Sequence, residues 1–73
     1  MSAVVKIKFF EGSWAYSYRA ASLAGSIEEI GLEVNREQGS IGQFDIICDG
    51  KLVFSKQKEG RFPEIEEMLK ILS

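Results

Sequence analysis

The chain has 73 residues, of which nine are Lys or Arg and eleven are Asp or Glu, so its net charge is −2. This length predicts a single domain, residues 1–73, with a small core. The basic residues are scattered, and this excludes nucleic acid as the main partner because phosphate binding needs clustered cations. No stretch approaches the roughly 20 apolar residues of a membrane helix, and the first twenty residues do not have the pattern of a secretory signal. We therefore expect a cytoplasmic protein that does not bind membranes.

The first half of the chain predicts a strand, a helix and a second strand. Apolar and basic residues alternate over 4–9, as in a half-buried strand. Helical spacing follows over 14–30, with Ser13 placed to cap the helix through its hydroxyl and Gly31 to end it. Alternation returns at 32–36, and a strand–helix–strand unit of this length favours a parallel pair. The expected buried face of the helix consists of Ala20, Leu23, Ala24, Ile27 and Ile30.

The second half predicts a hairpin and a closing helix. Strands at 44–48 and 51–55 flank Asp49-Gly50, a two-residue turn that requires positive φ. A loop at 39–42 precedes the hairpin, and a polar connection at 56–61 follows it. We expect Pro63 in the first turn of the closing helix. The apolar stripe of that helix is Ile65, Met68, Leu69 and Leu72.

This β-α-β-β-β-α order predicts an α/β fold, an α+β sandwich in which both helices lie on one face of a four-stranded mixed sheet. Alternation in the hairpin places Ile46 with Val53 in one row, and Ile47, Leu52 and Phe54 in the opposite row. An apolar row that no helix covers is typical of an association surface. Self-association as a homodimer through the open sheet face is therefore one hypothesis for the partner.

The second half also carries a pattern of residue types with a specific spacing. It reads Gly42-x-Phe44-Asp45-Ile46-x-x-Asp49-Gly50-Lys51-Leu52-Val53-Phe54-Ser55-Lys56, followed by Glu59-Gly60-Arg61-Phe62-Pro63-Glu64. With Val5-x-Ile7 and Tyr16-x-x-Arg19-Ala20 upstream, the chain resembles the Rdx family, the small group that contains selenoproteins W, T and H. The resemblance covers essentially the whole chain and implies a thioredoxin-like fold.

The loop before the first helix departs from that family. Its members carry Tyr-Cys-x-x-Cys there, or selenocysteine in the second position. Counting back from Arg19-Ala20 puts Phe10 at the tyrosine position and Glu11 and Trp14 at the two redox positions. A carboxylate and an indole cannot form or attack a disulfide. The resemblance therefore implies a vacated redox loop, Phe10-Glu11-Gly12-Ser13-Trp14, and the activity of the family does not carry over.

The residues leave two functions open. The first is a non-catalytic protein-binding or regulatory module, whose partner is another protein or a second copy of the chain. It is favoured because aromatic side chains concentrate around the loop, and such side chains bring large contact area to interfaces. These are Phe9, Phe10, Trp14, Tyr16 and Tyr18.

The second function is a thiol oxidoreductase that uses Cys48, the single cysteine, or a thiol of a partner. Cys48 is better explained as a small packing residue, since free cysteine behaves as a buried hydrophobe. Asp45 and Asp49 lie close to it in sequence and would raise the thiol pKa, which disfavours reactivity. Glu11 could act as an acid or base only if it were buried beside Trp14. One cysteine and no histidine predict no disulfide, metal or cofactor.

Overall fold

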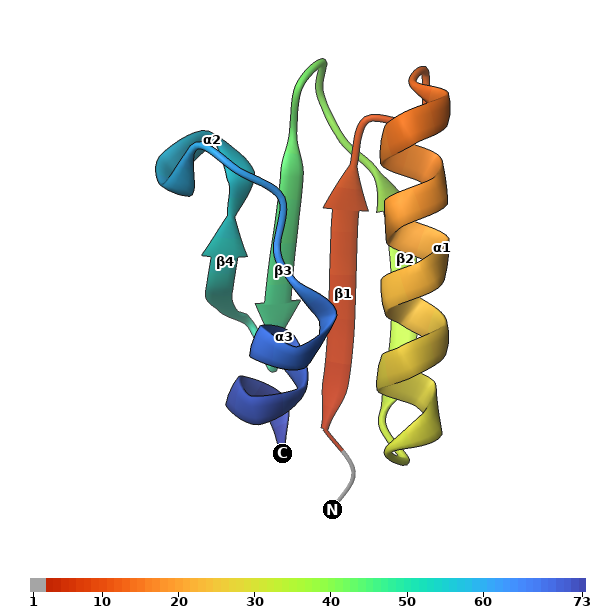
Figure 1. Ribbon diagram of the computed structural model, residues 1–73, viewed down its shortest axis with the longest axis vertical. Helices are drawn as coiled ribbons and strands as arrows, with labels where there is room; N and C mark the ends of the chain where they lie inside the picture. The colour runs from red at the N-terminus through yellow and green to blue at the C-terminus, as the bar shows by residue number, and fades with distance from the viewer. Residues whose placement is uncertain (1–2) are drawn as a thin grey trace.

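The structure is a computed structural model that describes residues 3–73. Within this range, strands and helices follow one another in the order that the sequence predicts, with one additional short helix after the hairpin (Figure 1). The elements are β1 (Val4–Phe9), α1 (Trp14–Glu29), β2 (Glu33–Gln38), β3 (Phe44–Cys48), β4 (Lys51–Ser55), α2 (Lys56–Glu59) and α3 (Ile65–Leu72).

The strands form one mixed sheet in the order β2-β1-β3-β4. β1 lies inside the sheet, parallel to β2 and antiparallel to β3, and β4 completes the hairpin. The parallel pair is joined by the helical crossover α1, as expected for two parallel neighbours. Alternation along β1 is complete, because Val5, Ile7 and Phe9 are buried while Lys6 and Lys8 are half-exposed on the other face.

Both long helices pack on one face of the sheet (Figure 1), which confirms the predicted α+β arrangement. The small side chains of Ala20 and Ala24 let α1 approach the sheet closely, and Met68 is the buried residue of α3. The core lies between these helices and the sheet. It comprises Val5, Ile7, Phe9, Ala20, Leu23, Ala24, Ile27, Phe44, Ile46, Phe54 and Met68.

The ends of α1 differ from the prediction in two details. Ser13 is the N-cap residue, but its side chain makes no capping hydrogen bond, and only its carbonyl accepts a bond from the Ser17 amide at 3.0 Å. Ile30 was expected in the buried face, yet it is 43% exposed because the helix ends at Glu29 and the chain turns away. Gly31 ends the helix as predicted, with φ of 92°.

The hairpin turn is confirmed, but one strand face was predicted wrongly. Asp49 and Gly50 have φ of 50° and 84°, as the two-residue turn requires. A bulge then interrupts the ladder, because Ile47 pairs with Leu52 while Ile46 pairs with Phe54. The extra residue reverses the alternation. Phe54 therefore joins Ile46 in the core, instead of the open row with Ile47 and Leu52.

The last third of the chain also departs from simple patterning. Part of the polar connection forms the single-turn helix α2, which ends at Gly60 in the left-handed conformation with φ of 77°. Pro63 lies before α3 rather than in its first turn, and Glu64 is the N-cap in an extended conformation. Residues 60–64 thus form an extended strap that joins α2 to α3 across the helix-bearing face (Figure 1).

Met68 attaches α3 to the sheet, and we expect its truncation to destabilise the fold. Met68 is 0% exposed, whereas Ile71 on the same helix is 54% exposed. Met68→Ala should lower the free energy of unfolding by about 2–5 kcal/mol, because a cavity remains where the side chain was. Ile71→Ala, the matched control, should change it by less than about 0.5 kcal/mol. Urea denaturation followed by circular dichroism measures both. Equal effects would contradict this account of how α3 is held.

Candidate functional site

The loop between β1 and α1 lies at one end of the sheet, beside the loop between β2 and β3 (Figure 1). Two backbone hydrogen bonds tie them together. The Phe10 amide donates to the Gln43 carbonyl at 3.0 Å, and the Gly39 amide donates to the Phe9 carbonyl at 2.7 Å. The start of α1 is therefore placed by backbone contacts as well as by its own packing.

Phe10 turns back over the loop instead of pointing into solvent. Its ring lies so close to Gly12 that any side-chain carbon at that position would overlap it. The same ring meets Tyr16 edge-on, with centroids 6.3 Å apart. Glycine at position 12 is thus explained by the close approach of an aromatic ring to the backbone.

The two positions that sequence reasoning singled out, Glu11 and Trp14, are both exposed. Glu11 lacks the burial that an acid–base role would need, and neither ion pair among residues 3–73 includes it. Trp14 is 81% exposed and stacks on Tyr18, with centroids 5.7 Å apart and an interplanar angle of 21°. Positions four apart on a helix are neighbours, so this pair could have been read from the sequence.

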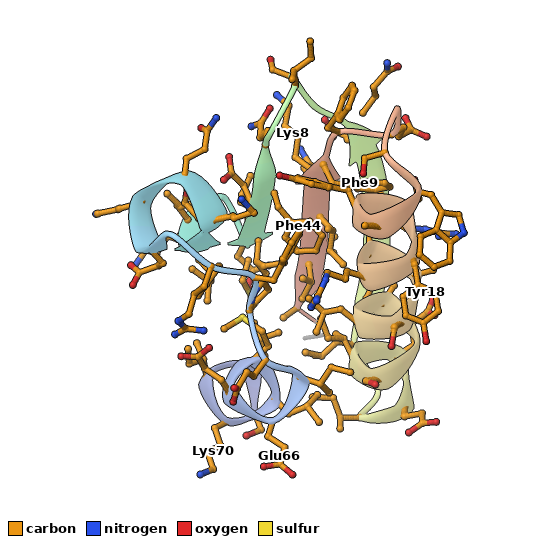
Figure 2. All side chains as sticks on the ribbon, turned by 45° about the horizontal axis from the view of Figure 1, so that its top comes forward. Lys8, Phe9, Tyr18, Phe44, Glu66 and Lys70 are labelled. Carbon is orange, nitrogen blue, oxygen red and sulfur yellow. The ribbon has the colours of Figure 1, made fainter. Side chains whose placement is uncertain are left out.

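A groove of about 370 Å³ lies between α1 and the segment that leads into α3. Figure 2 shows that Tyr18 comes from α1 and Phe44 from β3. The lining side chains of α1 fall in two rows with four-residue spacing, which places them along one side of the helix. We call this feature the Trp14 groove. Its lining is Trp14, Ala15, Tyr18, Arg19, Ser22, Leu23, Phe44, Pro63 and Ile65.

Phe62 connects the strap to this groove. Its ring meets Tyr16 edge-on at 4.9 Å and Phe44 edge-on at 5.4 Å between centroids. The guanidinium of Arg19 lies 4.3 Å from the ring centroid of Phe62, and the Lys56 ammonium lies 5.1 Å from it. The contact with Phe62 therefore holds Arg19 beside the groove through a cation–π interaction. Sequence reasoning missed this part of the site, because nothing local relates Phe62 to positions more than forty residues earlier.

The open face of the sheet is mostly polar. Lys6 forms an ion pair with Glu37 at 2.9 Å, and its hydrogen bond holds the pKa of the Glu37 carboxyl below the ordinary value. Its apolar members include Ile47, which is half-buried, and Leu52, which is 55% exposed. With Phe54 turned to the core, this face offers less apolar surface than the hairpin pattern predicted.

No group of three or more His, Cys, Asp or Glu side chains in residues 3–73 is arranged to hold a metal ion. None of the helices described has both the length and the apolar character that a membrane crossing requires.

Comparison with known proteins decides the lineage. The model of the Rdx family matches residues 5–73, nearly the whole chain. The chain belongs to the Rdx family. A SelT-like protein from Arabidopsis thaliana is 42% identical over 64 residues, which cover 84% of the chain. The match spans only 30% of that protein, so the chain corresponds to about a third of the length of this relative.

Solved structures give the same fold for this Rdx chain. A selenoprotein W-related protein from Vibrio cholerae superimposes with a TM-score of 0.88 at 22% identity, over 99% of the chain and 94% of that protein. A protein from Bordetella parapertussis gives a TM-score of 0.85 at 24% identity, over 96% and 92%. At these identities the likeness establishes the fold alone, which is the thioredoxin-like fold of selenoprotein W-related proteins.

The only cysteine of this Rdx domain lies far from the loop. Cys48 pairs with Val5 near the start of β1, whereas the loop follows Phe9 at the end of that strand. Val5 and Phe9 are four residues apart along β1, which corresponds to a length of about 13 Å. Cys48 is half-buried and packs against the core. Burial raises the pKa of the Cys48 thiol, and the neighbouring Asp49 carboxylate raises it further.

We expect Cys48 to react slowly with alkylating reagents. Because its pKa is raised in the folded chain, less thiolate is present at neutral pH than in the unfolded chain, and the thiolate is the reactive form. Labelling with iodoacetamide, followed by mass spectrometry across pH 6–10, should give a midpoint above the ordinary value of about 8.5. The same chain in denaturant should label faster at neutral pH. A folded-state midpoint below the denatured one would show an activated thiol instead.

Proposed function

We propose that this chain is a non-catalytic binding module of the Rdx family, active in the cytoplasm, that holds a protein partner through the Trp14 groove. The exposure of Trp14 carries the proposal. An indole that is 81% exposed and stacked on a second exposed ring presents a large, preordered contact surface. Such aromatic anchors supply much of the binding energy at protein interfaces.

The ordering of the two rings supports binding over a purely structural role. Trp14 and Tyr18 stack side by side on α1 and contribute little to the core. Their packing against each other restricts rotamers before a partner arrives, which lowers the entropy cost of binding. The Trp14 groove beside them has the volume to accept side chains of a partner.

The chemistry of the loop supports a non-catalytic role. Its five residues, 10–14, include no thiol, and Cys48 lies about 13 Å away along the sheet. A disulfide exchange would need a thiolate at the loop or a mobile one elsewhere, whereas Cys48 sits on a strand within the core packing. A free thiol of this kind fits a reducing compartment, which is why the proposal places the chain in the cytoplasm.

Capture with matched variants tests the proposal. Tagged wild-type chain, Trp14→Ala and Leu52→Ala would each be used to capture proteins from the native host, with quantitative mass spectrometry as the readout. Both substitutions remove an exposed apolar side chain, but Leu52 lies on the opposite, open sheet face. We expect Trp14→Ala to reduce capture of the specific partner at least about ten-fold, as loss of an interface anchor does, and Leu52→Ala to leave it unchanged.

The reverse pattern would contradict the proposal. Loss of the partner with Leu52→Ala and retention with Trp14→Ala would place binding on the open sheet face. Light scattering on the same three proteins identifies a second copy as the partner. A dimer that dissociates only in Leu52→Ala would support the homodimer through that face and exclude the Trp14 groove as the interface.

A further inference from the structure

We propose that the Trp14 groove selects an acidic segment of its partner, with an apolar side chain in the groove and a carboxylate bound to Arg19. This inference rests on the proposed function and names the chemistry of the partner. It starts from the charges around the groove. Among residues 3–73, Arg19 is the only charged side chain that lines the groove, and no carboxylate in this range lines it.

Arg19 has an aromatic partner, Phe62, but no anionic partner within residues 3–73. Its guanidinium rests on the ring of Phe62, 4.3 Å from the centroid. Neither of the ion pairs and none of the side-chain hydrogen bonds found in the described chain involves it. Stacking on an aromatic face leaves the edge of a guanidinium free, and that edge carries the donors that match a carboxylate.

Arg61, unlike Arg19, has a carboxylate partner within the chain. Arg61 donates to both carboxylate oxygens of Glu67, at 3.0 and 2.8 Å, and is therefore satisfied within the chain. Both arginines also line a second, adjacent hollow, which includes Glu64 and Glu66. These carboxylates repel an acidic group on that side. The favourable approach for a carboxylate is therefore from the side of α1, over the Trp14 groove.

The groove supplies the apolar half of the recognition. Trp14 and Tyr18 form one wall, and Pro63 and Ile65 form the other. A side chain inserted between these walls buries apolar area, while the flanking carboxylate meets Arg19. The two contacts together specify an acidic segment with an adjacent aromatic or aliphatic residue. A purely apolar segment leaves the Arg19 guanidinium without a carboxylate partner, and a basic segment brings a like charge next to it. Both lower the affinity of the groove for the segment.

Defined peptides test this inference directly. Trp14 is the only tryptophan of the chain, so its fluorescence reports occupation of the groove. Three capped peptides would be titrated, each with one phenylalanine followed by two glutamates, two glutamines or two lysines. We expect the glutamate peptide to bind about ten-fold more tightly than the glutamine peptide, as a charged hydrogen bond contributes. The lysine peptide should bind most weakly, and added salt should reduce the difference.

Variants assign the preference to Arg19. Arg19→Gln should make the glutamate and glutamine peptides bind equally, whereas Arg36→Gln, which removes the same charge from the edge strand β2, should leave the preference intact. Arg19→Lys keeps the charge and should retain part of the preference. A thermal melt of each variant checks that the fold is kept. Retention of the preference in Arg19→Lys and its loss in Arg19→Gln separate the charge from a structural effect.

Three results would overturn the inference. These are equal binding of the glutamate and glutamine peptides to the wild type, a preference that survives Arg19→Gln, and no binding of any peptide at millimolar concentration. None of these results decides whether a partner binds through the Trp14 groove, because capture that depends on Trp14 does not require an acidic partner. Capture that persists in Trp14→Ala would in turn reject the groove as the interface, whatever the peptides show.

Discussion

Phe62 packs edge-on against Tyr16 and Phe44, with ring centroids 4.9 and 5.4 Å away, and this contact joins three separate parts of the fold. Tyr16 belongs to α1, Phe44 to β3, and Phe62 to the strap that leads into α3. Aromatic pairs of this geometry contribute about 0.5–1.5 kcal/mol beyond the area that they bury. Arg19 of α1 also stacks on the Phe62 ring, so two side chains of α1 contact the strap at this residue.

The site follows from that attachment. With Phe62 in place, Pro63 and Ile65 form the wall that faces α1, and the stack on Phe62 holds Arg19 at the boundary of the groove. Trp14 adds the exposed wall at the start of α1, directly after the loop in which the Phe10 ring covers Gly12. The loop of a thioredoxin-like fold thus opens onto a surface of aromatic and aliphatic side chains instead of a thiol.

Much of the fold could be predicted because its signals are local. Alternation over residues 4–9 predicts the inner strand, and Asp49-Gly50 predicts the turn from its requirement for positive φ. Phe54 was misplaced because a bulge depends on how two strands pair, and alternation within one strand does not report it. The site was harder to predict for a related reason. Glu11 and Trp14 belong to the loop itself and are found by counting along the sequence, whereas Phe62 reaches Arg19 only through tertiary packing.

We propose that this Rdx chain works by binding and not by thiol chemistry. Multiple-turnover reduction of a chromogenic aromatic disulfide by excess dithiol tests it most directly, with wild type and Cys48→Ser compared against the reaction without protein. We expect both proteins to give the uncatalysed rate, since Cys48 is half-buried, has a raised pKa and lies at the opposite end of β1 from the loop. Acceleration by the wild type that Cys48→Ser abolishes would contradict it.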